Sequence, residues 1–206
     1  GEGDFLLPII GRLVRSYVAH GGDLAKAGEE LAEALVAVEV HASSLHGART
    51  TVAHELRRLG IPDTAAHSLA GRWLVLGDFL QVELRGEFTH VVGNPPYVRQ
   101  ELIPENLLAK YRARYRTLYD RADLYVPFFE RSLGLLAPGG RLGFICTDRW
   151  TKNKYGGPLR KLVATDYALT HYVDLLNAPA FTTEVMTYPA ITVIERPAQR
   201  GAAVAA

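Results

Sequence analysis

Apolar residues recur along the chain at two spacings, one typical of helices and the other of strands. Helical spacing predicts helices over residues 5–19, 23–35, 41–59, 104–119, 122–136 and 157–164. Asp23 is the expected N-cap of the second helix, and Gly60 is expected to end the third. β-rich runs predict strands at residues 36–40, 73–76, 88–92, 141–147, 169–175 and 190–195. Residues 64–72 are expected to form a loop and residues 137–140 a turn.

The alternation of these elements predicts an α/β fold with a mostly parallel sheet, helices on both faces and a C-terminal antiparallel hairpin. In such sheets ligands bind outside the carboxyl ends of the strands. Polar or glycine-rich breaks are expected along that rim at residues 1–5, Glu39, Asp78 and residues 94–97. Four successive breaks indicate a nucleotide-like ligand beside a reaction site.

Composition narrows the function classes only a little. The 206 residues suffice for one α/β domain, and the net charge of +1 means that any nucleic-acid-binding surface must be local. A lone cysteine, Cys146, excludes an intramolecular disulfide and a cysteine-only metal site. The histidines have no ligand spacing, so no metal is predicted. No segment is long enough to span a membrane, so a cytoplasmic protein is expected.

Three of the four breaks could hold a cofactor. The turn "GEGDF" opens a helix, and its glycines allow a ligand to approach the backbone, although a plain helix-entry turn is an equal alternative. Glu39 could accept hydrogen bonds from ribose hydroxyls or be a solvated strand-end acid. Asp78 could accept from the exocyclic amine of an adenine or cap a turn.

The motif "NPPY", residues 94–97, is more specific. An aromatic amino group is a poor nucleophile because its lone pair is delocalised into the ring. The Asn94 side-chain oxygen and the Pro95 carbonyl could accept its two hydrogens and draw the nitrogen towards tetrahedral geometry. The Tyr97 ring could stack on the planar substrate. The alternative is a structural Pro-Pro turn with a packing tyrosine.

The motifs "GEGDFLLP", "VEVH", "LGDF", "NPPYVRQE", "DLYVPFFERSLGLLAPGGRLGFICTDRW" and "YGGPLRKL" together resemble the gamma-class DNA adenine-N6 methyltransferases. The resemblance covers essentially the whole chain and is greatest to the subgroup of type IIG restriction-modification enzymes and phage-defence methylases. It implies a Rossmann-like, S-adenosylmethionine-dependent methyltransferase fold acting on double-stranded DNA. The target adenine would have to be flipped out of the duplex.

The resemblance also implies roles for individual residues. The catalytic motif is Asn94, Pro95, Pro96 and Tyr97, and the cofactor-binding residues are Gly1, Gly3, Phe5, Glu39, Asp78 and Phe79. Phe181 corresponds to the aromatic that stacks on the flipped base opposite Tyr97, unless it is a core aromatic in a hairpin loop.

On this comparison the chain is a partial catalytic domain. Residues 1–80 would be the cofactor-binding half, residues 81–196 the catalytic half and residues 197–206 a tail. The first strand, with its Asp-Pro pair, and the downstream target-recognition domain are expected to be missing. Whether these 206 residues bind the cofactor alone is therefore open.

Basic residues supply the candidates for DNA contact. Residues 110–116 carry a tyrosine stripe and a basic stripe at helical spacing. The basic stripe could contact DNA phosphates. Alternatively, the tyrosines pack on the core and the basic stripe faces solvent. Other basic residues follow the catalytic motif or the strand 141–147. The full set is Arg99, Lys110, Arg112, Arg116, Arg149, Lys152 and Lys154.

Two other functions fit parts of the sequence. Protein-glutamine methyltransferases also use an Asn-Pro-Pro-Tyr turn, but the long insert after the motif favours the DNA family. A non-catalytic remnant that serves as a structural module would explain the truncated glycine motif.

Overall fold

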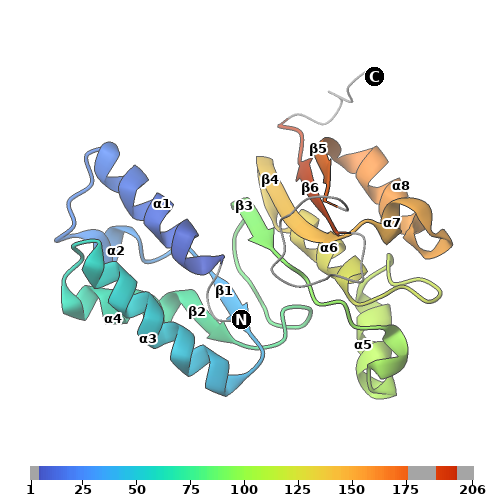
Figure 1. Cartoon of the computed structure of the whole chain (residues 1–206), viewed down its shortest axis with the longest axis horizontal. Coiled ribbons are helices and arrows are strands. Elements are labelled where there is room, and N and C mark those ends of the chain that lie inside the picture. The colour runs from blue at the N-terminus through green and yellow to red at the C-terminus, as the bar shows by residue number, and fades with distance from the viewer. Residues whose placement is uncertain (1–4, 176–188, 199–206) are drawn as a thin grey trace. The chain divides into compact units, whose positions relative to one another are not determined.

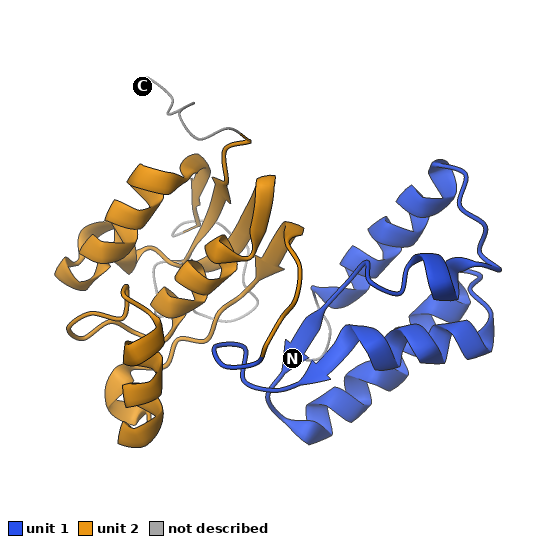
Figure 2. Cartoon of the chain, turned by 180° about the vertical axis from the view of Figure 1, so that it is seen from behind, with its two compact units in different colours: residues 1–82 blue, residues 83–206 orange. Residues whose placement is uncertain are grey.

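The computed structural model describes residues 5–175 and 189–198, and the chain divides into two compact units, Gly1–Val82 and Glu83–Ala206 (Figure 2). The first unit holds α1 (Leu6–Ala19), α2 (Ala27–Glu30), β1 (Ala37–Glu39), α3 (Ala42–Arg58), α4 (Asp63–Trp73) and β2 (Leu74–Leu76) (Figure 1). The second holds β3 (Phe88–Gly93), η1 (Gln100–Leu102), α5 (Glu105–Arg114), α6 (Tyr125–Gly134), β4 (Leu136–Thr147), α7 (Arg149–Lys152), η2 (Lys154–Gly156), α8 (Gly157–Asp166), β5 (Ala168–Asp174) and β6 (Pro189–Glu195).

The core of the first unit lies where α1, α3 and α4 meet. Ile10, Leu56 and Trp73 are fully buried there, one from each helix. The Trp73 indole Nε1 donates to the Leu31 carbonyl at 2.9 Å, which satisfies the one polar atom of that ring. Gly60 has φ +94°, as expected for the residue that ends α3.

Residues 64–72 are helical, so the prediction of a loop there is wrong. Ala66, Leu69, Ala70 and Trp73 recur at intervals of three and four residues and are all buried. The side chains between them are small or polar, and this composition made the helical spacing hard to recognise in the sequence.

The helix predicted over residues 23–35 is also wrong in extent, because only α2 forms. The Asp23 side chain caps a turn, accepting from the Ala25 amide at 2.9 Å, and does not begin a helix. After α2, backbone hydrogen bonds join residues three apart, such as Ala34 N to Leu31 O at 3.0 Å, so the chain continues as turns.

Strands β1 and β2 are parallel, as predicted, and their carboxyl ends lie side by side. Glu39 is in register with Leu76, and the Gly77 amide donates to the Glu39 carbonyl at 2.9 Å. The polar segments that follow these two strands therefore emerge from one edge of this small sheet.

The second unit is built on a four-stranded sheet in the order β3-β4-β6-β5. β3 and β4 are parallel, whereas β6 is antiparallel to both β4 and β5, in agreement with the predicted hairpin. Leu142, Phe144 and Cys146 of β4 are buried on one face, where α6 contacts the sheet and α8. Alternate β4 residues on the other face, such as Gly143 and Ile145, are partly exposed.

The turn predicted at residues 137–140 is instead an irregular part of β4. Phe88 pairs with Leu136 but His90 pairs with Arg141, so β4 bulges between the two pairs. Gly139 adopts φ +77°, and its amide donates to the Arg196 carbonyl at 2.7 Å. The glycines thus allow a bulge that stays paired, and the strand continues through it.

The helices predicted at 104–119 and 122–136 exist but are shorter. Tyr115 is extended at the end of α5, with φ −119° and ψ 113°, and Asp120 lies at φ +54°. Between them the chain turns and brings the Leu124 amide to the Val98 carbonyl at 2.8 Å. Within the described part of the chain, no helix combines the length and apolar character that a membrane span requires.

Candidate active site at the carboxyl end of β3

The candidate catalytic turn, residues 94–97, follows β3 directly, so the parallel pair β3–β4 fixes its place at one edge of the sheet. Pro95 is buried, whereas Asn94, Pro96 and Tyr97 are exposed. The Tyr97 hydroxyl donates to Asn94 Oδ1 at 3.0 Å and lies 3.4 Å from the Ile145 carbonyl of β4. The turn is therefore cross-linked to itself and to the neighbouring strand.

This turn presents two carbonyl acceptors. Asn94 Oδ1 has two lone pairs, so the bond from Tyr97 leaves one available. The Pro95 carbonyl accepts no hydrogen bond from any residue that the structure describes. Because proline fixes φ, that carbonyl is held on a stiff scaffold.

Tyr97 is the outermost ring of an aromatic series. Its ring meets Tyr125 edge-on at a centroid distance of 6.5 Å, and Tyr125 meets Phe129 at 6.4 Å. The Tyr125 hydroxyl lies 3.0 Å from that of Tyr155, so its polar atom is satisfied although the residue is fully buried. Burial raises the pKa of Tyr97 to about 12, so its hydroxyl is a proton donor at neutral pH.

A carboxyl group that sequence analysis missed, Asp123, lies beside the turn. The backbone bond between Leu124 and Val98 brings it alongside residues 97–99. Burial raises the pKa of Asp123, while the positive charges of Arg149 and Arg99 work in the opposite direction. Asp123 thus places a partly buried carboxyl near the candidate turn, and the charges of Arg149 and Arg99 act on it.

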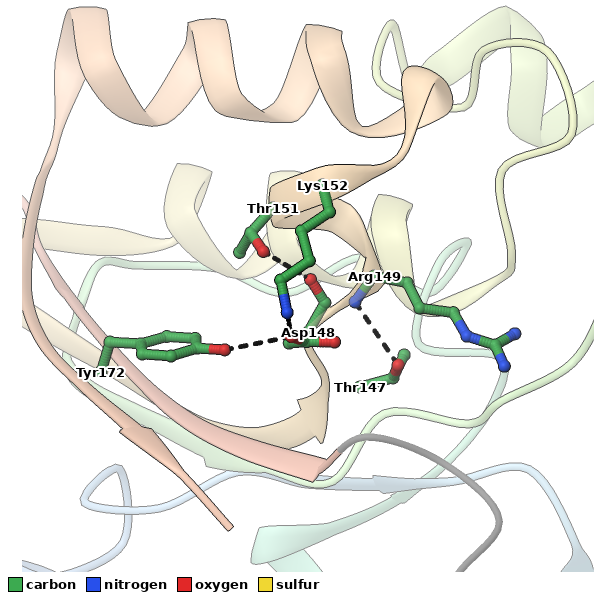
Figure 3. A network of polar contacts seen from close by, with 6 residues as sticks. All are labelled: Thr147, Asp148, Arg149, Thr151, Lys152 and Tyr172. Atoms are coloured by element: carbon green, nitrogen blue, oxygen red, sulfur yellow. Dashed lines mark hydrogen bonds and ion pairs between the residues drawn. The ribbon is translucent and has the colours of Figure 1, made fainter. Parts of the chain in front are cut away.

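A second missed carboxylate, Asp148, lies at the carboxyl end of β4 (Figure 3). Its Oδ2 accepts from Lys152 Nζ at 2.5 Å and from the Tyr172 hydroxyl at 3.2 Å. The hydrogen bond with Asp148 raises the pKa of Lys152, so the ammonium is favoured. The rule that selected Glu39 and Asp78, a polar residue directly after a strand, would also have found Asp148.

The cofactor candidates of the first unit lie at the carboxyl ends of β1 and β2. Glu39 Oε1 accepts from the His41 amide at 2.9 Å. Burial works to raise the pKa of Glu39, but the hydrogen bond from His41 leads a larger set of opposing effects, so that pKa is lowered. Asp78 accepts from the Leu80 amide at 2.9 Å and from Gln81 Nε2 at 2.6 Å, which is the alternative role of a turn cap.

Two aromatic candidates of the first unit have unequal exposure. Phe5 is exposed just before α1, and Phe79 is half-buried after β2. Gly1, Gly3 and Phe181 lie outside the described residues. Within the described ranges, 5–175 and 189–198, no three His, Cys, Asp or Glu side chains gather as a metal site would require.

The basic candidates fall into two groups. In α5, Tyr111 is buried against the core, and Arg112 donates to Gln100 Oε1 at 2.8 Å. Arg116 lies 3.9 Å from both Glu130 and Asp166. By contrast, no hydrogen bond or ion pair to another described residue holds the side chains of Arg99, Lys110, Arg149 and Lys154.

The α/β fold of the chain is similar to that of a solved S-adenosylmethionine-dependent class I methyltransferase from Listeria monocytogenes, with a TM-score of 0.54 at 15% identity, over 78% of this chain and 43% of that one. It superposes on the ATP-dependent Type ISP restriction-modification enzyme LlaBIII, solved bound to DNA, with a TM-score of 0.69 at 15% identity, over 97% of this chain and 16% of that one. The M protein of the Type I restriction enzyme EcoKI gives a TM-score of 0.53 at 14% identity, over 79% of this chain and 31% of that one.

Sequence comparison then identifies the family. Residues 63–181 match the Eco57I restriction-modification methylase family, and the chain belongs to that family. It is 67% identical to the Type II methyltransferase M.XhoI of Xanthomonas vasicola, over 96% of this chain and 36% of that protein. It is 54% identical to M.PaeR7I of Pseudomonas aeruginosa, over 95% and 34%. The chain thus spans about a third of the length of these relatives.

Proposed function

We propose that the protein is a DNA methyltransferase that transfers a methyl group from S-adenosylmethionine to the N6 amino group of an adenine in duplex DNA. The observation that carries the proposal is the pair of acceptors at the end of β3, Asn94 Oδ1 and the Pro95 carbonyl, beside the ring of Tyr97. Membership of a restriction-modification methylase family supports DNA as the substrate.

The residues of the turn act on the amino group by hydrogen bonding. Asn94 Oδ1 and the Pro95 carbonyl accept its two hydrogens and favour tetrahedral geometry at the nitrogen, which frees the lone pair for attack. Both acceptors are neutral, so they orient and polarise the amine without removing a proton in advance. Pro96 stiffens the turn, and the Tyr97 hydroxyl holds the Asn94 amide with its oxygen at a fixed position.

The aromatic rings retain the adenine outside the helix. Flipping a base costs a few kcal/mol of unstacking, and stacking on an aromatic side chain contributes about 1–3 kcal/mol per base. Tyr97 supplies one ring and Phe181 the other in this proposal. The exposed position of Tyr97, with 44% of its surface accessible, suits a ring that meets a ligand.

The residues of the first unit fit S-adenosylmethionine in part. Glu39 presents a carboxyl side chain at the end of β1, and a carboxylate there suits ribose hydroxyls. Asp78 and Phe79 after β2, with Gly1, Gly3 and Phe5 before α1, complete the proposed cofactor site. When bound, the cofactor supplies the methyl group on an electrophilic sulfonium.

The test is methyl transfer by the full-length protein from labelled S-adenosylmethionine to duplex DNA, with a glutamine-containing peptide as the competing substrate. We expect label in DNA as N6-methyladenine, and single-molecule sequencing of modified bases then gives the site. Asn94→Ala should lower the rate at saturating DNA by at least about 100-fold, as expected when one group that stabilises developing charge is removed. Label in the peptide and none in DNA would refute the proposal.

A further inference from the structure

The segment that follows β4, residues 147–160, is folded tightly and is called the strap below. Thr151 Oγ1 donates to the Asp148 carbonyl at 2.7 Å. Arg160 donates to the carbonyls of Trp150 at 2.6 Å and Asn153 at 2.9 Å. These bonds close the short elements α7 and η2 onto the start of α8. The strap is therefore a preformed surface.

Within the strap, Asp148 holds one lysine in place. The Asp148 side chain is 5% exposed and that of Lys152 is 70% exposed, yet their charged atoms lie 2.5 Å apart. The Tyr172 hydroxyl of β5 donates to the same oxygen, Oδ2, at 3.2 Å (Figure 3). A lysine normally loses considerable side-chain freedom when it binds, and this anchorage removes part of that cost in advance.

The strap concentrates positive charge. Residues 147–160 contain four Lys and Arg residues and a single carboxylate, whereas the whole chain has a net charge of +1. Arg149 and Lys154 have no hydrogen-bonded or ion-paired partner among the described residues. The Arg149 guanidinium points away from the Asp148 cluster (Figure 3). A polyanion is the partner that such a surface fits.

The strap is also connected to the candidate catalytic turn. Tyr155 of η2 places its hydroxyl 3.0 Å from that of Tyr125, and the Tyr125 ring contacts the Tyr97 ring. The basic helix α5 is less suited to bind a polyanion, because Arg112 is hydrogen-bonded to Gln100 and Arg116 lies near two carboxylates.

We propose that the strap is the docking surface for the DNA backbone phosphates next to the target adenine, and that Asp148 is the positioning residue for its Lys152. This inference rests on the proposed function. Arg149 and Lys154 supply cations that are hydrogen-bonded or ion-paired to no described residue, and Lys152 retains N–H groups for a phosphate while Asp148 fixes its place. Phosphate contacts of this kind set the register of a protein on the duplex and carry no sequence information themselves.

The first test is the salt dependence of duplex binding by the full-length protein. Each phosphate contact contributes about 0.9 to the slope of log Kd against log salt, so Arg149→Ala/Lys154→Ala should reduce the slope by about 2. Lys26→Ala/Arg72→Ala removes the same charge from exposed positions of the first unit and should leave the slope unchanged. An unchanged slope in the strap variant, or a larger reduction in Lys110→Ala/Arg112→Ala, would overturn the proposal.

The second test separates positioning from charge. Asp148→Asn removes a negative charge, so simple electrostatics would strengthen DNA binding and steepen the slope. Positioning predicts instead that Asp148→Asn and Lys152→Ala each reduce the slope by about 1, and that the double variant adds nothing further. Tighter binding by Asp148→Asn would refute the positioning role, and the exposed Lys152→Ala keeps the test valid if Asp148→Asn does not fold.

Methyl transfer by the same preparations distinguishes failure of this inference from failure of the proposed function. If the wild-type protein methylates duplex DNA and none of the strap variants changes the salt slope, only the docking surface is wrong. If the wild-type protein transfers no methyl group to any duplex, the proposed function fails, whatever the slopes are.

Discussion

At the scale of single residues, the hydroxyl and the ring of Tyr97 have separate tasks. The hydroxyl orients Asn94 through a 3.0 Å bond, and the ring is the proposed stacking surface. Tyr97→Phe should therefore keep the stacking and lower the methylation rate by less than about tenfold, since a neutral hydrogen bond contributes about 0.5–1.5 kcal/mol. Tyr97→Ala should abolish the stacking as well.

These two variants are distinguished by 2-aminopurine at the target position. Its fluorescence rises when the base leaves the helix, so Tyr97→Phe should retain the wild-type signal and Tyr97→Ala should change it. Equal loss of rate and signal in both variants would show that the hydroxyl, and not the ring, determines base binding.

The pKa of Tyr97 leads to a prediction on stability. Burial raises it from 10.0 to about 12, so the folded state binds this proton more tightly than the unfolded state. The associated stability is fully present below pH 10 and is lost as the pH rises towards 12. Urea unfolding at several alkaline pH values should show a shallower decline for Tyr97→Phe than for the wild type. Parallel declines would indicate that Tyr97 titrates normally.

Residue patterns in the sequence predicted the candidate catalytic turn but not the residues around it. Residues 94–97 combine breakers, an amide and a ring, and this composition is visible without any tertiary contact. Asp148 directly follows a strand, so the rule that selected Glu39 and Asp78 could have found it. Asp123 is a single acid in a polar segment, and only its burial marks it out. Pairwise contacts across the sheet carry that information, and periodicity does not.

At the scale of elements, the strap depends on a close approach at Gly156. A Cβ there would overlap the Trp150 carbonyl oxygen, to which Arg160 also donates. Gly156→Ala should therefore lower the free energy of unfolding by about 1–3 kcal/mol, as overpacking does. The adjacent Gly157 begins α8, and a Cβ there would lie 3.9 Å from Arg160, an ordinary contact.

Gly157→Ala is thus the matched control for Gly156→Ala. Alanine is favoured over glycine within a helix by up to about 1 kcal/mol, so Gly157→Ala should leave the stability unchanged or increase it. Thermal and urea unfolding of both variants give the comparison. Equal destabilisation by the two substitutions would mean that the loss reflects glycine flexibility and not the contact with Trp150.

The elements themselves show which local signals suffice. α3 was predicted correctly because its apolar period ends at Gly60, which adopts the positive φ that glycine favours. α4 was missed because its buried positions include alanines, whose short side chains resemble a loop composition. The glycines of residues 137–140 signal a turn locally, but pairing with β3 on either side of them and backbone hydrogen bonds with Arg196 keep them in β4. Tertiary pairing decided that last case.

At the scale of the whole molecule, the candidate residues for the two substrates belong to different compact units. The cofactor candidates Glu39 and Asp78 belong to the first unit, and the candidate base-binding residues Asn94 and Tyr97 belong to the second. Each unit has its own buried core, so a substitution in one should leave the folding of the other largely intact. Binding of the two substrates should therefore be separable by mutation.

Two variants of the full-length protein test this division. Glu39→Ala should weaken S-adenosylmethionine binding by about 10- to 100-fold, because hydrogen bonds to a charged group contribute about 1.5–3 kcal/mol, while the Kd for duplex DNA stays near the wild-type value. Asn94→Ala should retain the cofactor affinity measured by calorimetry and lose the methylation rate measured in the transfer assay. If Glu39→Ala weakened DNA binding and left cofactor binding unchanged, the assignment of the first unit to the cofactor would be wrong.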